Sequence, residues 1–397
     1  MNQKLLILAI GAFIIGTDSY IVAGLLLGIT TDMSISISAA GQLVTIFAIT
    51  MAIASPLLTM LTSSMNPKKI LVWTMIIFTM GNFVSFLSTD YFMLSSSRVI
   101  AALGAALYFP IATSLAASMA DSDKQGKAIS FVSAGLTIAI TLGAPMGAWL
   151  GNLFNWRISF LIIALVGAIV TIIIHVVFPA EHSHERERAS IVESLTPVKR
   201  VAVLLLFVAI LLITTGSFAV YTYLDPIMSV IDHFSTAGVS FMFALFGGSS
   251  IIGVWLGGYL TDKIGSLPTI YLTLTFKIIS LVGFSLLMHN DWPMSKMWLG
   301  CLIVSWGITA WMLNPAILKY LVSLSPKSPS VLLALNSTFS FFGTASGAAV
   351  GGVIIENNAI QHLGYLCGIL QLLSLLMIVI CSIGISNRSN NQGIEAI

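Results

Sequence analysis

Apolar runs of about twenty residues follow one another along the whole chain of 397 residues. A helix of that length crosses the roughly 30 Å hydrocarbon core of a bilayer. Because lipid offers no hydrogen-bond partners, each backbone group in such a run must pair within its own helix or within a closed barrel. Barrel strands would show short segments of alternating polarity, and this sequence has no such pattern. The runs therefore predict an all-α integral membrane protein.

The composition excludes a fold that faces water on all sides. Hydrophobic residues make up 57% of the chain and charged residues 8%, with a mean hydropathy of +1.00, whereas a soluble domain carries about 25% charged residues. The net charge of +2 comes from basic residues scattered singly and in pairs, so no nucleic-acid partner is expected. The three cysteines lie in apolar runs without a CxxC pair, so we expect no metal site and no cofactor.

We predict twelve transmembrane spans in two groups of six. The first group is expected at residues 5–29, 39–62, 70–88, 92–118, 127–151 and 157–178, and the second at 201–228, 237–261, 268–289, 294–320, 329–355 and 362–386. The domains that follow from this division are an amino-terminal six-helix bundle (1–178), a cytoplasmic linker (179–200), a carboxy-terminal six-helix bundle (201–386) and a cytoplasmic tail (387–397).

Lysine and arginine residues gather on one side of the predicted bundle. If the amino terminus is cytoplasmic, that side receives nearly all of the basic loop residues, and the other side receives only Arg157 and Lys296. Short loops with an excess of positive charge stay in the cytoplasm. Both termini are therefore predicted to be cytoplasmic. A monomer is the expected state, because the core is internal to the twelve spans.

The two groups of spans repeat each other. The segment LTSSMNPKKI (61–70) follows the second span, and LTDKIGSLPTI (260–270) follows the eighth. Parallel half-repeats of six spans are typical of transporters that alternate access around a site at the membrane midplane. We therefore expect two pseudo-symmetric bundles with a binding site between them.

Small residues recur at every fourth position in the predicted fifth and eleventh spans. A helix face made of small side chains lets two backbones approach closely in lipid. We expect this face to pack against another helix, along the seam where the two halves rock. The residues concerned are Gly135, Gly143, Gly147 and Gly347.

Four stretches resemble a known family of transporters. They are GTDSYIVAGLLLGITTDMSISISAAGQL (16–43), RVIAALGAALYFPIA (98–112), GLTIAITLGAPMGAWLG (135–151) and GGYLTDKIG (257–265). In these stretches, and over residues 5–386 as a whole, the chain resembles the major facilitator superfamily. More specifically, it is similar to the twelve-span drug:proton antiporter group, and within that group to arabinose-type efflux permeases and bacterial purine efflux pumps.

This resemblance implies proton-coupled export from a bacterial cytoplasm, across the cell membrane, by alternating access. The motif around Pro145 is the one associated with export rather than uptake. Asp262 stands at the acidic position of the gating-loop motif, which implies a latch on the cytoplasmic side. The first-half copy of that loop departs from the motif, with Ser63 at the acidic position.

Asp18 lies near the middle of the first apolar run. A charged side chain at the bilayer centre costs at least about 2.5–3.5 kcal/mol, so such residues face a cavity or a partner and carry function. Desolvation favours the protonated form of a carboxylic acid, and proton coupling requires a group that exchanges a proton near neutral pH. We predict that Asp18 carries the coupling proton and that Arg98 in the fourth span is its partner. The alternative is a permanent, structural ion pair.

Polar and aromatic residues mark the spans that line the central cavity in the resembled family. An apolar pocket with a few placed hydrogen-bonding groups suits a flat aromatic or amphipathic solute. The alternative for Tyr221, Tyr223 and Trp311 is a role as interfacial anchors. The full set of predicted substrate-binding residues is Tyr20, Gln42, Tyr108, Tyr221, Tyr223, Trp306, Trp311, Asn314 and Asn336.

Two further charged residues fall within the predicted spans. Asp225 precedes Pro226 near the outer end of the seventh span, where it is either a helix-end acid or a second proton site. Lys277 lies in the middle of the ninth span, which is peripheral in the resembled architecture. It is expected to snorkel or pair with a neighbour, with contact to substrate as the alternative.

Other functional classes have weaker support in the sequence. The HExxH and GxSxG motifs of hydrolases and the GxxxxGK[ST] loop of ATP-driven pumps do not occur. A passive uniporter or a proton-coupled uptake permease of the same architecture remains the alternative to export. The substrate is a small molecule, with drug-like amphiphiles, nucleobases or nucleosides, sugars and metal-chelating metabolites all open.

Overall fold

The structure is a computed structural model that describes residues 3–62, 64–121, 124–178, 201–232, 234–290, 292–324 and 329–394. Within these ranges every regular element is helical, and twelve helices are long and apolar enough to cross a membrane. The predicted fold class is therefore confirmed. The predicted linker, residues 179–200, lies outside the described residues.

The amino-terminal half contains six long helices, and polar caps begin several of them. Asn66 accepts hydrogen bonds from two backbone amides at the start of α3. Asp90 and Asn155 each accept a hydrogen bond from a backbone amide in the first turn of α4 and of α6. Such side chains satisfy amides that have no partner within the helix. The helices are α1 (Gln3–Met33), α2 (Ile37–Leu61), α3 (Pro67–Leu87), α4 (Tyr91–Ser118), α5 (Gln125–Leu153) and α6 (Trp156–Val177).

The carboxy-terminal half repeats this arrangement with one extra short helix. Gly265 joins two of its helices with a φ of 93°, a backbone conformation that favours glycine. The elements are α8 (Val201–Thr222), α9 (Leu224–Ile231), α10 (Thr236–Ile264), α11 (Ser266–His289), α12 (Ser295–Leu324), α13 (Pro329–Glu356), η2 (Ile360–His362) and α14 (Leu363–Ile394).

The predicted seventh and twelfth spans differ from the observed helices. The seventh was expected to continue to residue 228, but α8 ends at Thr222 and α9 begins separately at Leu224. Pro226 explains the break, because in a continuous helix its ring would clash with the carbonyl of Thr222, four residues earlier. At the other end of the chain, α14 continues to Ile394, into the stretch expected to be a tail.

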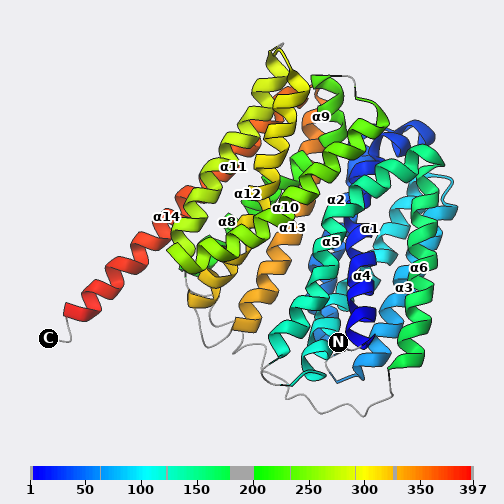
Figure 1. The fold of residues 1–397 in the computed structure, drawn as a ribbon, viewed down its shortest axis with the longest axis horizontal. Helices are drawn as coiled ribbons and strands as arrows, with labels where there is room; N and C mark the ends of the chain where they lie inside the picture. The colour runs from blue at the N-terminus through cyan, green and yellow to red at the C-terminus, as the bar shows by residue number, and fades with distance from the viewer. Residues whose placement is uncertain are drawn as a thin grey trace.

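The two halves form separate bundles that meet chiefly along two pairs of helices, and α1 also contacts α8 and α9. Helix α2 packs against α13, and α5 packs against α10. Figure 1 shows the start of α1 and the end of α14 at the same end of the molecule, which we call the terminal end. The opposite end, where α9 lies, is called the distal end.

The glycines predicted to form the seam between the halves lie inside the bundles instead. A Cβ atom added at Gly135 would fall 2.1 Å from the carbonyl oxygen of Ala9, so α5 is in backbone contact with α1. Gly143 and Gly147 face the same helix. The predicted close approach of backbones is present, but it joins neighbours within one half.

The carboxy-terminal half shows the same pattern. A Cβ atom added at Gly347 of α13 would lie 2.4 Å from the carbonyl oxygen of Thr215 in α8. Contact between the halves is made by a different glycine, Gly247 of α10, where an added Cβ atom would lie 2.4 Å from the Cα atom of Thr141 in α5. The halves therefore meet mainly through the contacts of α5 with α10 and of α2 with α13.

Candidate functional site

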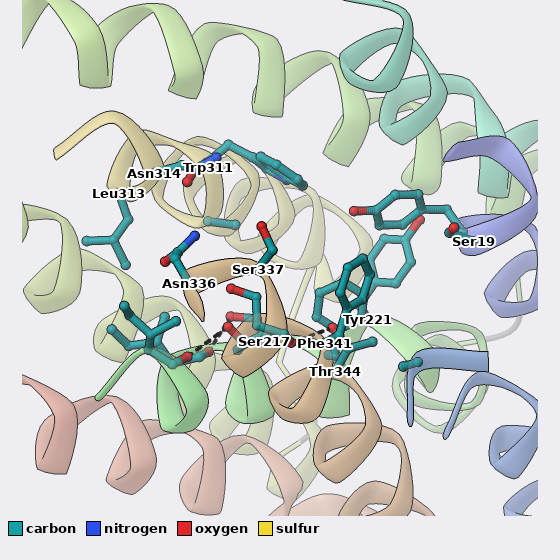
Figure 2. A pocket seen from close by; sticks show the side chains of 18 of the residues that line it. Ser19, Ser217, Tyr221, Trp311, Leu313, Asn314, Asn336, Ser337, Phe341 and Thr344 are labelled. Carbon is teal, nitrogen blue, oxygen red and sulfur yellow. Dashed lines mark hydrogen bonds between the residues drawn. The ribbon is translucent and has the colours of Figure 1, made fainter. Parts of the chain in front are cut away.

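A cavity of about 320 Å³ lies between the two halves, near the middle of the helices. Both halves contribute to its wall, with Tyr20 from α1 and Phe47 from α2 facing residues of α8, α12 and α13. Figure 2 shows Tyr221, Trp311, Asn314 and Asn336 around the same space. Of the nine residues predicted to bind substrate, those that line this cavity are Tyr20, Tyr221, Trp306, Trp311, Asn314 and Asn336.

Aromatic rings form one side of the cavity. The ring of Tyr221 lies 5.7 Å from that of Tyr20 in an edge-to-face arrangement, and 6.5 Å from that of Trp306. The Tyr221 hydroxyl and the Trp306 indole nitrogen are buried, and neither has a hydrogen-bond partner among the described residues. Buried polar groups are normally paired, so both are available to a bound solute.

Amide and hydroxyl groups form the opposite side. Asn314 comes from α12 and Asn336 from α13, and Figure 2 shows both beside the cavity with Ser337. Ser217 and Thr344 also line it, although each hydroxyl donates to a carbonyl of its own helix. The side-chain amides thus supply the hydrogen-bonding groups on this side.

A larger cavity, of about 1060 Å³, continues from the first toward the terminal end. The two share part of their walls, including Ser19, Tyr20 and Phe341. Leu61 and Ser64, which lie where α2 ends and the next loop begins, line the larger one. The space between the halves therefore extends from the centre of the molecule to its terminal end.

The remaining predicted substrate-binding residues lie elsewhere. Tyr223 is fully buried between α2 and α13, and its hydroxyl donates to the carbonyl of Ala348 at 2.8 Å. Its hydroxyl also lies against Gly41 of α2, so the side chain sits at the contact between the halves. Tyr108 lines the larger cavity while its hydroxyl donates to the carbonyl of Leu8. Gln42 is not among the described residues that line either cavity.

Lys277 lines the smaller cavity, which agrees with the alternative given for this residue, contact with substrate, and not with a position facing away from the cavity. Its helix, α11, was predicted to be peripheral, but the side chain is only 1% exposed and lies on the cavity wall with residues of α8 and α12. A lysine in the middle of an apolar run carries the same signal as Asp18, because its charge is equally costly there. That criterion is what singled out Lys277 in the sequence, although the position of its helix was expected to be peripheral.

Asp18 and Arg98 form a buried ion pair, as predicted. The Nη1 atom of Arg98 donates to Oδ1 of Asp18 at 2.7 Å, and Nη2 donates to the backbone carbonyl of the same residue at 3.2 Å. The two side chains are 0% and 1% exposed. The rings of Phe47 and Phe160 cover the guanidinium, with centroids 4.4 Å and 5.5 Å from its central carbon.

Asp262 and Asp225 occupy different ends of the molecule. Asp262 lies inside α10 near the terminal end, and its carboxylate accepts a hydrogen bond from Lys319 of α12 at 2.8 Å. The acid at the gating-loop position thus pairs with a lysine of the same half. Asp225 is buried in the first turn of α9 at the distal end, where an acid interacts favourably with the helix dipole.

Comparison with known proteins identifies the family. Residues 8–348 match the family model described as the Major Facilitator Superfamily. The chain belongs to this superfamily. Its members are transporters, so the chain is a multi-pass membrane transporter and not an enzyme.

Similar proteins from two bacteria support the assignment to the Major Facilitator Superfamily. The chain is 31% identical to the MFS-type transporter YbcL of Bacillus subtilis over 397 residues, which cover 99% of this chain and 98% of that protein. It is also 31% identical to the inner membrane transport protein YdhP of Escherichia coli over 358 residues, covering 90% of each.

A solved structure has the same fold. It is that of a bacterial homologue of the human lysosomal transporter Spinster, in an inward-facing and unoccupied conformation. The two share 18% sequence identity with a TM-score of 0.74, over 95% of this chain and 94% of the other. At this identity the likeness supports the fold alone.

Proposed function

We propose that the protein exports a small organic solute from a bacterial cytoplasm in exchange for protons, as its resemblance to drug:proton antiporters suggests. The observation that carries this proposal is the ion pair between Asp18 and Arg98, which lies behind one wall of the central cavity. A titratable acid at this depth is costly to the fold and needs a functional reason.

Alternating access supplies the transport step. The distribution of lysine and arginine assigns the terminal end to the cytoplasm, and the larger cavity extends to that end. A cytoplasmic solute enters there and reaches the aromatic and amide groups of the smaller cavity. Movement of the halves about the α2–α13 and α5–α10 contacts then closes the cytoplasmic side and opens the distal side.

Proton coupling requires a link between the cavity and Asp18. Phe47 supplies this link, because its ring lines the cavity and also covers the guanidinium of Arg98. While a solute holds the ring against the guanidinium, Arg98 keeps Asp18 paired and ionised. Once the solute has left on the distal side, the ring can move, the hold of Arg98 weakens, and the carboxylate accepts a proton for the return step. Each proton that moves inward yields about 2.3 kcal/mol per 100 mV of membrane potential.

A passive uniporter or an uptake permease of the same fold is the alternative. It is favoured by the complete burial of the Asp18–Arg98 pair, which does not itself line either cavity. In that case the pair is structural, and transport follows the solute gradient without dependence on pH.

Transport by the purified protein distinguishes these functions. Growth of a deletion strain on a panel of antibiotics and toxic nucleobase, nucleoside and sugar analogues first identifies a transported solute. Proteoliposomes are then loaded with that solute, and its movement is followed with and without an imposed pH gradient, for the wild type and Asp18→Asn. We expect uphill movement in the wild type only, while exchange at equal concentrations persists in the variant. Uphill export by Asp18→Asn at the wild-type rate would contradict the assigned proton site.

A further inference from the structure

We propose that the central cavity binds an organic anion, a solute that combines a flat ring with a carboxylate or similar acidic group, and that Lys277 is its counter-ion. This inference rests on the proposed transport function and names the substrate class that the cavity takes.

The first step is the position of Lys277 along its helix. It lies eleven residues after the start of α11 and twelve before the end, or about 16–18 Å from each end at 1.5 Å per residue. A lysine side chain cannot bridge that distance to the membrane surface. Lys277 is also only 1% exposed, so the cavity that it lines is the space into which its ammonium group can extend.

The second step is the lack of a compensating charge. None of the ion pairs formed among the described residues includes Lys277. The titratable group that interacts with it is the buried thiol of Cys367 in α14, and a thiol carries no formal charge to balance an ammonium group. A buried charge without a partner is unfavourable, so an anion that enters the cavity gains an interaction that the resting protein does not supply.

The third step is the character of the rest of the wall. Of the described residues that line the cavity, Lys277 alone is basic and none has a carboxylate, so the wall offers a site for one positive charge and no opposing negative charge. Trp306, Trp311 and Tyr221 offer ring faces and edges. Asn314 and Asn336 offer amide donors. An aromatic ring with an acidic group matches all three features.

Binding of matched pairs of compounds tests this proposal. The probes are benzoate, 2-naphthoate and indole-3-acetate, each compared with its uncharged carboxamide. Purified protein in detergent is heated with each probe. Unfolding is followed by a thiol-reactive fluorophore, which reacts with Cys367 and Cys381 only after unfolding because both thiols are buried in the folded protein. Titration of each probe at fixed temperature gives its affinity.

We expect at least one acid to stabilise the wild type more than its amide does. Lys277→Gln should weaken binding of that acid about ten- to a hundredfold, the range for a hydrogen bond to a charged group, and leave the amide unchanged. Lys277→Arg should keep the preference for the acid. The matched control is Lys124→Gln, since Lys124 is exposed and pairs with Asp121 away from the cavity.

Two results would overturn the proposal. One is a wild-type protein that prefers no acid over its amide, and the other is an acid preference that survives in Lys277→Gln. If Lys277→Gln does not fold, the comparison of acids with amides on the wild type and on Lys277→Arg still decides. Binding is measured without a pH gradient, so this outcome is independent of whether Asp18 carries a proton.

Discussion

The ring of Phe47 separates the Arg98 guanidinium from the central cavity. Its centroid lies 4.4 Å from the guanidinium carbon, and the same side chain forms part of the cavity wall. A cation over an aromatic face is worth about 2 kcal/mol when both are desolvated. The ring therefore holds Arg98 against Asp18 and isolates the pair from any solute that enters the cavity.

Replacement of Phe47 by alanine should uncouple transport from the proton gradient. Without the ring, the Asp18–Arg98 pair meets the cavity directly, and protons reach the acid whether or not a solute is bound. We expect uphill export to fall steeply and proton entry without solute to rise, as followed by a pH-sensitive dye inside proteoliposomes.

The control for this prediction is Phe341→Ala. Phe341 also lines the cavity, whereas the rings that cover the Arg98 guanidinium among the described residues are those of Phe47 and Phe160. It should change solute affinity without a proton leak. Equal leaks in the two variants would show that loss of cavity volume, rather than exposure of the ion pair, is responsible.

The Asp18–Arg98 pair should respond to mutation as a unit. Removal of one partner of a buried ion pair leaves the other charge uncompensated and costs about 3–5 kcal/mol of unfolding free energy. Asp18→Asn alone should therefore lower the stability of the purified protein more than the double variant Asp18→Asn, Arg98→Gln, as measured by unfolding in denaturant or by heat.

Asp121→Asn provides the matched control for this comparison. It makes the same substitution in the pair that Asp121 forms with Lys124, where the side chains are 73% and 59% exposed. Exposed pairs contribute about 0–1 kcal/mol, so little change in stability is expected. Additive effects at Asp18 and Arg98 would indicate that the two groups do not depend on each other.

The α1–α5 contact should tolerate no bulk at Gly147. A Cβ atom there would lie 2.8 Å from the carbonyl oxygen of Ile21, so Gly147→Leu must push the two helices apart. We expect transport to fall steeply while the protein still inserts, because the span remains apolar. Membrane yield and transport rate are measured together.

Gly258→Leu is the control, since nothing lies within 4 Å of a Cβ atom at that position of α10. It should transport normally. Gly247→Leu tests the contact between the halves, where an added Cβ atom would lie 2.4 Å from Thr141. Wild-type transport by this variant would place the moving surface elsewhere.

The sequence predicted the spans and the ion pair because both depend on the cost of burial in lipid. That cost reveals the depth of a residue, such as Asp18 or Lys277, but not the side of the helix on which it lies. Lipid and protein interior are both apolar, so a buried span shows no clear polar face. The arrangement of the spans was therefore taken from the family resemblance, which implied a peripheral Lys277 and placed Gln42 and Tyr223 at the cavity.

Other features depend on contacts between distant parts of the chain. The division between α8 and α9 was readable from Pro226, whose ring prevents a continuous helix. By contrast, the contact of Phe47 with Arg98 joins α2 to α4, and no spacing in the sequence reports it. The glycine stripes predicted close packing correctly, but their partners were set by the arrangement of all the helices.

Asp262→Asn should slow turnover with little effect on folding. The carboxylate pairs with Lys319, and both side chains are more than half exposed, so the pair contributes at most about 1 kcal/mol to stability. If Asp262 acts as a latch, its loss favours the state open at the terminal end. Exchange rates should fall while solute affinity is kept. An unchanged exchange rate would assign the latch to other residues.

The orientation of the protein decides the direction of transport and is testable with single cysteines. In a background with Cys301, Cys367 and Cys381 replaced, Met65→Cys reports on the terminal end and Phe154→Cys on the distal end; both native side chains are exposed. The excess of basic residues in the terminal loops predicts that this end is cytoplasmic. In intact cells, an impermeant thiol reagent should therefore label position 154 and not position 65, and position 65 should react once the membrane is broken.

Labelling of position 65 in intact cells would show that the orientation is the opposite one. The larger cavity would then extend to the outside, and an uptake permease would become the better account of the same ion pair.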